Sequence, residues 1–228
     1  MQQIISFNSL KDFLLFLRRK ECYLLPGGEG SEGQCYLSKL DGKLYKFINK
    51  VDNNGEPVVK YDITKIITTQ DIDLIHYVLP EELYVINNQL IGYKTKYIKE
   101  DNFFTEIPSK KISIKVYNLT EKKLLSAYYR ILKETDRLSK KSIQTYDLNC
   151  NILFTGEDYF GIDTCGYQHT ENDVFSENKY ALEEAIKENL SQILYNFNFL
   201  SMKSADELME ECDMEIYTRK LVKLIKKN

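Results

Sequence analysis

A glycine-rich stretch, GGEGSEG at residues 27–33, stands immediately before a predicted β-hairpin. The hairpin consists of two alternating runs, 34–40 and 43–48, separated by an Asp-Gly pair at 41–42. Asp-Gly between two such runs is a strong signal for a tight turn between antiparallel strands. A dinucleotide-binding loop of the Rossmann type leads instead from a strand into a helix, whose N-terminus receives the pyrophosphate. The order of elements here therefore excludes a Rossmann fold.

The glycines have the spacing G-x-G-x-x-G at Gly28, Gly30 and Gly33, with Ser31 between them. Small residues in a β-turn let backbone N–H groups close over phosphate groups. Lys46, on the strand after the Asp-Gly turn, is placed to hold the same phosphates as a point charge. The alternative interpretation is a glycine-rich surface turn followed by an ordinary exposed lysine.

A second polar cluster lies in YDLNCNILFTGEDYFGID, residues 146–163. The pattern predicts a polar loop that enters a strand, a turn at 156–158, and a second strand that ends near Asp163. This hairpin brings Asn151 close to Asp163, and amide and carboxylate oxygens are ligands that suit Mg²⁺. Asp147, on the loop, can orient or deprotonate an attacking hydroxyl group. Alternatively, these polar side chains only satisfy turns.

The motif YDLNCNIL resembles the catalytic loop of the protein-kinase-like superfamily, commonly H-R-D-x-x-x-x-N or H-G-D-x-x-x-x-N, and GIDT resembles its D-F-G segment. The similarity is greatest to small bacterial kinases and enzymes of the aminoglycoside-phosphotransferase type. It implies ATP and Mg²⁺ as cofactors, with the glycine loop over the phosphates and Lys46 holding them. By the same resemblance, Asn151 and Asp163 bind the metal and Asp147 is the catalytic base.

The segment IGYKTKYIKEDN, residues 91–102, resembles the fifth strand and hinge of this superfamily. The resemblance implies that backbone groups of Lys96, Tyr97 and Ile98 contact adenine. Thr95 then occupies the position that guards the back of the adenine pocket.

The catalytic-loop motif departs from the superfamily pattern in its spacing. Asp147 and Asn151 stand four residues apart, whereas the superfamily's aspartate and asparagine stand five apart. Either the loop has lost one residue and Asp147 still serves as the base, which we favour, or Tyr146 occupies that position and activity is crippled. Because positioning dominates this chemistry, a displacement of about 1 Å can cost about 100-fold in rate.

Two further departures concern the partner of the lysine and the end of the chain. Residues 58–77, where the superfamily has a helix whose glutamate pairs with the strand lysine, contain no glutamate. Asp71 or Asp73 is a candidate substitute, but the favoured interpretation of each is a helix cap or a surface acid. The D-F-G segment reads Asp-Thr-Cys at 163–165, and no A-P-E motif follows. A full eukaryotic-type substrate platform therefore does not fit.

The sequence predicts a single kinase-like α+β domain, 1–228, with two lobes. The N-lobe, 1–99, is expected to be a small antiparallel sheet, and the C-lobe, 100–228, to be a reduced helical one. Apolar residues at helical spacing predict a helix that begins at an Asn118 capping box, a central helix within 178–200 and a terminal helix within 214–228.

Composition limits the partners. The net charge of -3 gives no general attraction to nucleic acid, and no apolar run approaches the ~20 residues that span a bilayer. Five scattered cysteines without a C-x-x-C pair, and only two histidines, argue against a zinc site. We therefore expect a cytoplasmic protein without stable membrane insertion and without a nucleic-acid partner.

These patterns predict transfer of the γ-phosphate of ATP to a hydroxyl group. A protein serine or threonine is favoured as acceptor over a small molecule, because no acidic helical insert typical of drug and sugar kinases is visible. The alternative is a pseudokinase, a nucleotide-binding or scaffold module without transfer activity. Transfer of AMP instead of phosphate is a third possibility.

Overall fold

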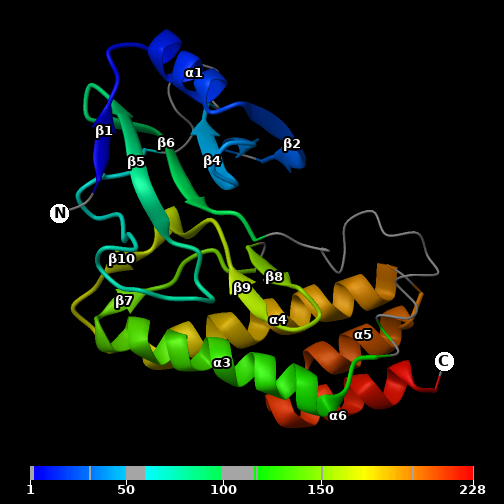
Figure 1. Ribbon diagram of the computed structural model, residues 1–228. Coiled ribbons are helices and arrows are strands. Elements are labelled where there is room, and N and C mark those ends of the chain that lie inside the picture. Colours follow the sequence, from blue (N-terminus) through cyan, green and yellow to red (C-terminus); the bar gives the residue numbers. More distant parts are fainter. Residues whose placement is uncertain are drawn as a thin grey trace. The chain divides into compact units, whose positions relative to one another are not determined.

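The computed structural model of the chain is shown in Figure 1. It describes residues 3–30, 32–49, 60–98, 116, 118–149, 151–196 and 198–227. The protein is α+β, as the sequence predicts. The chain divides into two compact units: unit 1 takes residues from 1–74, 78–98 and 164–168, and unit 2 takes residues from 75–77, 99–163 and 169–228.

Unit 1 is organised around a six-stranded sheet in the order β1-β5-β6-β4-β3-β2. The strands are β1 (Ile4–Ser6), β2 (Cys22–Glu29), β3 (Gly33–Ser38), β4 (Lys43–Ile48), β5 (Pro80–Ile86) and β6 (Gln89–Lys96). All neighbouring strands are antiparallel except β1 and β5, which are parallel. The expectation of a purely antiparallel sheet was therefore wrong, because a three-residue strand is too short to show alternation in the sequence.

The Asp-Gly hairpin is confirmed: β3 and β4 pair in antiparallel register, with Leu37 opposite Leu44. Side chains of β4 alternate between the two faces of the sheet. Tyr45 and Phe47 belong to one buried cluster, whereas Ile48 belongs to another. Lys46 therefore lies on the Ile48 face, where its register partner on β6 is Tyr93.

The helix α1 (Leu10–Arg19) covers the Tyr45 face of the sheet. Ser9 caps it, because the Ser9 hydroxyl oxygen accepts a hydrogen bond from the Asp12 backbone N–H at 3.2 Å. Two residues one turn apart on α1 are buried against aromatic side chains of the strands; the cluster contains Phe13, Leu17, Tyr45, Phe47 and Tyr84. The helix is thus held by one apolar stripe.

The expected helix within 58–77 is not observed: residues 60–79 form turns and irregular structure, and residues 58 and 59 lie outside the described part of the chain. The carboxylate of Asp71 accepts hydrogen bonds from the backbone N–H and the hydroxyl of Thr68, at 2.8 and 2.9 Å. This local bonding offers the backbone an alternative to a helix, and the isoleucines and threonines at 63–69 have low helix propensity.

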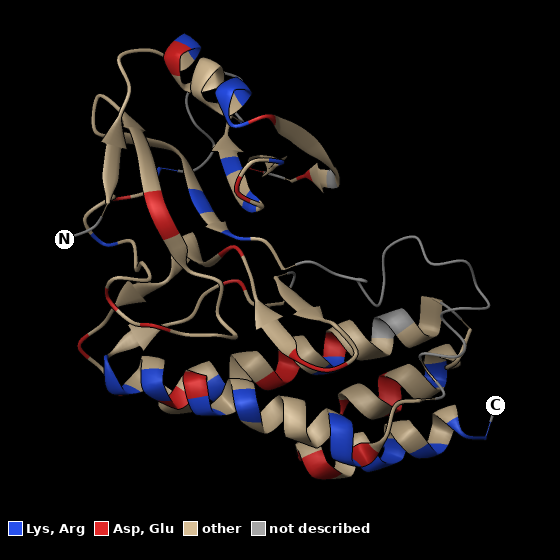
Figure 2. Ribbon diagram, viewed as in Figure 1, with Lys and Arg blue, Asp and Glu red and all other residues tan. Residues whose placement is uncertain are grey.

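Unit 2 contains four helices in its described residues: α3 (Glu121–Lys140), α4 (Phe175–Asn196), α5 (Met202–Met209) and α6 (Met214–Ile225). The predicted central and terminal helices are thereby confirmed as α4 and α6. The cap of α3 is Thr120 and not Asn118, because the Thr120 hydroxyl oxygen accepts from the Lys123 N–H at 3.2 Å. The exposed charged side chains of α3 are mostly basic: Lys122, Lys123, Arg130, Lys133, Arg137 and Lys140 (Figure 2). Acidic side chains pair with Lys123, Arg130 and Lys140.

Two small strand pairs accompany these helices. β8 (Ile152–Phe154) and β9 (Tyr159–Gly161) form the predicted hairpin, with Ile152 opposite Gly161. β7 (Ile143–Gln144) pairs with β10 (Gln168–His169), and a short 3₁₀ turn at Thr164–Gly166 precedes β10. None of the helices in the described ranges has the length and hydrophobicity needed to span a lipid bilayer.

Candidate functional site

The glycine-rich stretch takes in the end of β2, the turn after it and the start of β3, so that Gly28 is in β2 and Gly33 is in β3. The backbone N–H of Gly30 donates to the carbonyl oxygen of Gly33 at 2.9 Å, and the β2–β3 register is irregular between Leu24 and Glu29. The predicted loop between antiparallel strands is therefore present. Ser31, the remaining predicted loop residue, lies outside the described residues.

The three glycines have different surroundings. A Cβ atom at Gly33 would lie 1.9 Å from the Phe47 carbonyl oxygen, and one at Gly28 would lie 2.9 Å from the Leu25 carbonyl oxygen. At Gly30 the nearest atom would be the Gly33 carbonyl oxygen at 4.0 Å. Packing therefore requires glycine at 33 and favours it at 28, whereas only Gly30 has open space beside it.

Lys46 is buried, with 6% of its surface exposed, and its Nζ atom lies 5.9 Å from the centre of the Tyr93 ring. Its ammonium donates to Oε2 of Glu32 at 2.8 Å, and the Tyr61 hydroxyl donates to Oε1 of the same carboxylate at 2.8 Å. This carboxylate partner therefore comes from the glycine turn and not from residues 58–77. The sequence offered no spacing rule that would connect residue 32 to residue 46.

The predicted adenine-contact residues lie at the end of β6. Lys96 is exposed, and Tyr97 and Ile98 follow it as half-buried residues outside regular structure. Thr95 is buried, and its hydroxyl donates to the Leu79 carbonyl oxygen at 2.9 Å. Residues 99–102 of the predicted hinge lie outside the described part of the chain.

In unit 2, Asn151 is hydrogen-bonded to Asp147 within the loop that was predicted to be catalytic. Its side-chain Nδ2 donates to the Asp147 carbonyl oxygen at 2.8 Å and to Asp147 Oδ2 at 3.3 Å. The backbone N–H of Asn151 donates to the Leu148 carbonyl oxygen at 2.9 Å, so the four-residue spacing forms a compact turn. The Tyr146 hydroxyl instead donates to Oε1 of Gln144 at 2.7 Å. Asp147 is therefore the residue whose carboxylate lies beside Asn151.

Asp163 is tied to the same turn through its neighbour. The N–H of Ile162 donates to the Asn151 carbonyl oxygen at 2.8 Å, and Asp163 comes next in the chain. Both Asp147 and Asp163 have left-handed backbones, with φ of 55° and 54°. Such conformations are uncommon for residues other than glycine, and they cluster at functional sites.

Asn178, on α4, holds the backbone that leads to Asp147. Its Oδ1 accepts from the N–H and the hydroxyl of Thr145, and its Nδ2 donates to Ser139 Oγ and the Ile143 carbonyl oxygen at 2.9 Å. Asn178 is 1% exposed, and all four bonds are buried. Sequence reasoning missed it, because a single asparagine within a helix carries no such signal.

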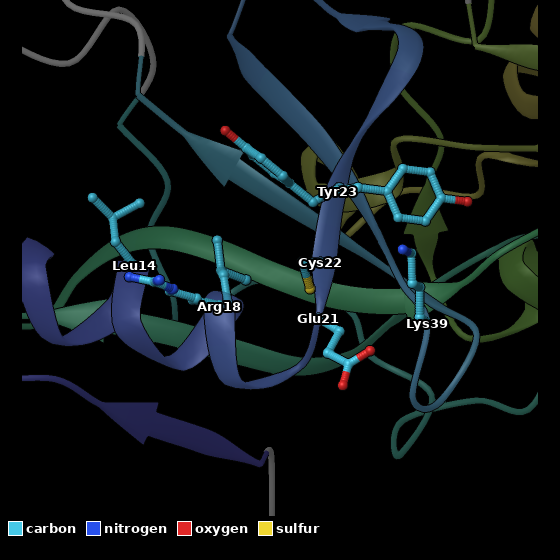
Figure 3. Close-up of a pocket in the computed structure, with 8 residues that line it drawn as sticks. Leu14, Arg18, Glu21, Cys22, Tyr23 and Lys39 are labelled. Atoms are coloured by element: carbon cyan, nitrogen blue, oxygen red, sulfur yellow. The ribbon is translucent and has the colours of Figure 1, made fainter.

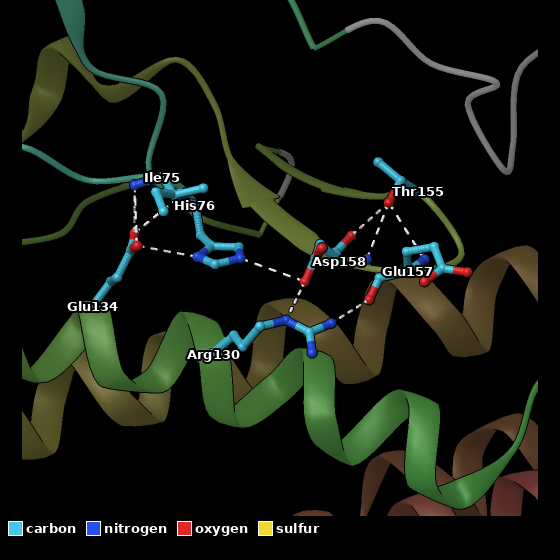
Figure 4. A network of polar contacts seen from close by, with 7 residues as sticks. All are labelled: Ile75, His76, Arg130, Glu134, Thr155, Glu157 and Asp158. Atoms are coloured by element: carbon cyan, nitrogen blue, oxygen red, sulfur yellow. Dashed lines mark hydrogen bonds and ion pairs between the residues drawn. The ribbon is translucent and has the colours of Figure 1, made fainter.

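A charged network joins α3 to the β8–β9 hairpin and to residues 75–77 (Figure 4). The His76 Nδ1 lies 3.1 Å from Glu134 Oε1, and its Nε2 lies 3.4 Å from Asp158 Oδ1. Arg130 Nε donates to the same Asp158 oxygen, and its guanidinium also donates to the Glu157 carbonyl oxygen at 2.7 Å. The network fixes the hairpin that leads to Asp163, and His76 has a structural role in it.

The metal-binding prediction rests on one amide and one carboxylate. Because Nδ2 of Asn151 is engaged with Asp147, its Oδ1 is the atom suited to a hard cation such as Mg²⁺. Within the described ranges, the side chains of His, Cys, Asp and Glu form no group of three that could hold a metal ion. A cation at Asn151 and Asp163 would therefore need oxygen ligands from phosphate or water as well.

A separate cavity of about 450 Å³ lies between α1 and the strands β2 and β3 (Figure 3). Its lining contains Leu14, Leu17, Arg18, Glu21, Cys22, Tyr23, Tyr36 and Lys39. Cys22 and Tyr36 pack against the cluster that includes Phe13, which is on the α1 side of the sheet. The cavity is thus on the face opposite Lys46 and is not part of the predicted phosphate site.

No protein-family model matches the chain, and no curated protein matches it at a significant level. The kinase resemblance therefore depends on the quoted motifs alone.

Proposed function

We propose that the protein is an ATP- and Mg²⁺-dependent phosphotransferase that moves the γ-phosphate to a hydroxyl group, in the first place that of a protein serine or threonine. Gly30 and its neighbours in the turn would cover the phosphates, and Lys46 would hold them. Asn151 and Asp163 would hold Mg²⁺, and Asp147 would act as the base.

The observation that carries the proposal is the linkage of Asn151 to Asp147. One amide group binds both the carbonyl oxygen and the carboxylate of Asp147, so the carboxylate is oriented by the proposed metal ligand itself. The left-handed backbones of Asp147 and Asp163 add support, because strained conformations of this kind persist where the surrounding structure fixes them.

The proposed chemistry assigns each of these groups a simple task. Asp147 accepts the proton of the acceptor hydroxyl while the hydroxyl oxygen forms a bond to the γ-phosphorus, and the bond from that phosphorus to the β–γ bridging oxygen breaks to release ADP. Lys46 neutralises negative charge on the phosphates as a fixed cation. Bound Mg²⁺ would supply further neutralisation of the phosphate oxygens.

A scaffold without transfer activity is the second candidate, and the ion pair of Lys46 supports it. The Glu32 carboxylate already binds the ammonium that would hold phosphate. A module that transfers no phosphate has no need to free Lys46 from Glu32.

Transfer of radiolabel from γ-labelled ATP in the presence of Mg²⁺, to the protein itself and to serine- and threonine-containing peptides, tests the proposal. Asp147→Asn is expected to lower the rate by about 100-fold or more, because a general base contributes about that much. Tyr146→Phe and the exposed Asp206→Asn on α5 are matched controls that should retain the rate. Transfer that is equally fast in Asp147→Asn would refute the assigned mechanism, and nucleotide binding without any transfer would favour the scaffold. Mass spectrometry of the product distinguishes added phosphate from added AMP.

A further inference from the structure

The contact between Glu32 and Lys46 joins the glycine turn to the centre of the sheet. Lys46 Nζ and Glu32 Oε2 are 2.8 Å apart, and the side chains are 8% and 21% exposed. The second oxygen of Glu32 accepts the Tyr61 hydroxyl hydrogen bond at 2.8 Å. Both oxygens of this carboxylate are therefore bound, one to a cation and the other to a hydroxyl donor.

We propose that Lys46 and Tyr61 form one anion-binding position, which the Glu32 carboxylate fills in the free protein and which a phosphate group of the nucleotide must take from it. The inference rests on the proposed function, because it assumes that Lys46 binds phosphate. It adds a competitor within the same chain and a further ligand, Tyr61, for the polyphosphate.

The chemistry of the two anions supports this exchange. A carboxylate and a phosphate each present oxygens that accept charge-assisted hydrogen bonds from an ammonium. Burial of an ammonium is costly unless an anion compensates its charge. Glu32 is an anion that meets this need until phosphate arrives.

Glu32 can leave the ion pair more easily than Lys46 can. Lys46 is on the inner strand β4, between β3 and β6, and its ammonium is nearly covered. Glu32 is on the turn between β2 and β3 and is more exposed. Displacement therefore moves Glu32 outward with its turn while Lys46 stays in place, which couples phosphate binding to the position of the glycine loop.

This competition has a measurable consequence for affinity. The apparent affinity of a ligand equals its intrinsic affinity multiplied by the fraction of molecules in the binding-competent state. If Glu32 leaves Lys46 in about one molecule in ten, removing the charge of Glu32 therefore tightens binding about tenfold. We expect Glu32→Gln to bind Mg²⁺–ATP about tenfold more tightly than the unaltered protein by isothermal titration calorimetry. Tripolyphosphate should gain by the same factor, since the competition involves phosphate and not the nucleoside.

Glu29→Gln is the matched control. Glu29 lies three residues earlier beside the same turn, is exposed, and accepts a hydrogen bond from Gln34 instead of a cation. Its neutralisation changes the net charge equally, and we expect an effect of less than about twofold, as for exposed charges in general. Glu32→Ala provides a second route to loss of the carboxylate, and circular dichroism checks that each variant is folded.

The outcomes separate the inference from the proposed function. Tighter ligand binding in Glu32→Gln and Glu32→Ala, but not in Glu29→Gln, supports the inference. When Lys46→Met is combined with Glu32→Gln, the gain in affinity should be lost. Unchanged or weaker binding in both Glu32 variants, or equal tightening in Glu29→Gln, would overturn it. Gain for tripolyphosphate without any binding of ATP would keep the anion position and reject the kinase proposal, and absence of both ligands from every variant would reject both.

Discussion

The side-chain oxygen of Asn178 accepts a hydrogen bond from the backbone N–H of Thr145 at 2.8 Å. The bond connects α4 to a segment 33 residues earlier in the chain, two residues before Asp147. With its bond to the Ile143 carbonyl oxygen, Asn178 satisfies one backbone group of the short strand β7 and one of the irregular segment that follows it. The position of the Asp147 loop therefore depends on a helix of unit 2.

Replacement of Asn178 by alanine should destabilise the protein by about 3 kcal/mol, because it leaves buried backbone groups of residues 143 and 145 without partners at about 1–3 kcal/mol each. Chemical denaturation followed by circular dichroism measures the change. Asn196→Ala, at an exposed position on the same helix, should change the stability by less than about 0.5 kcal/mol. Equal stabilities of the two variants would show that the Asn178 bonds contribute little.

The network around His76 leads to a second prediction. Glu134 accepts hydrogen bonds from the backbone N–H groups of Ile75 and His76, at 3.0 and 2.8 Å, and contacts the His76 ring. Because Glu134 is 6% exposed, Glu134→Gln removes a buried charge from an intact network and should cost about 3 kcal/mol. Asp136→Asn, two residues further on α3, breaks only the exposed pair with Lys140 and should cost less than about 1 kcal/mol. Thermal unfolding of the two variants measures both losses of stability, and equal losses would contradict the prediction.

Elements with local signals could be predicted from the sequence. The Asp41-Gly42 turn, the β8–β9 hairpin and helix α4 each depend on residues close in the chain, and each was found. The three-residue β1 was not predicted, because its pairing with β5 is a contact across almost 80 residues that no local pattern encodes. The expected helix within 58–77 came from the resemblance alone, and the described part of that segment is bonded as turns.

In the candidate site, too, contacts between residues close in the chain could be predicted and contacts between distant residues could not. Asp147 and Asn151 are four residues apart, so a loop motif was enough to connect them. The pair formed by Lys46 and Glu32 requires the actual shape of the turn, which decides whether a side chain points toward the sheet or into solvent. The anchor at Asn178 required knowledge of tertiary packing for the same reason.

The surroundings of Cys22 lower the reactivity of its thiol. Burial, together with the negative charge of Asp41, raises the pKa of the Cys22 thiol to about 11, from 9.0. The thiolate is the reactive form, so Cys22 should react slowly with iodoacetamide at pH 8. Cys212 is exposed and should be alkylated first among the described cysteines. Peptide mapping by mass spectrometry measures the order, and faster modification of Cys22 in the folded protein would contradict it.

The same shift has a consequence for stability. The unfolded chain loses the Cys22 proton near pH 9, whereas the folded protein keeps it until about pH 11. Between these values the folded state binds more protons, so the contribution of Cys22 to stability falls as the pH rises. Cys22→Ser should make the decline of the unfolding temperature between pH 9 and pH 11 less steep than in the unaltered protein. An equal slope in both proteins would show that Cys22 does not titrate in this way.

Substitutions of two glycines, Gly33 and Gly30, distinguish an effect on packing from an effect on ligand binding. Gly33→Ala places a Cβ 1.9 Å from the Phe47 carbonyl oxygen, a backbone atom of the neighbouring strand that cannot move without disturbing the sheet. We expect a loss of about 3 kcal/mol in unfolding free energy, at the upper end for overpacking. Gly30→Ala has open space and should leave the stability within about 0.5 kcal/mol.

If the turn covers phosphates as proposed, Gly30→Ala nevertheless weakens Mg²⁺–ATP binding, because a methyl group then stands between the backbone and the phosphates. Denaturation and calorimetry on the same two variants measure both effects, and a Gly30→Ala protein with full stability and full ATP affinity would remove Gly30 from the binding role.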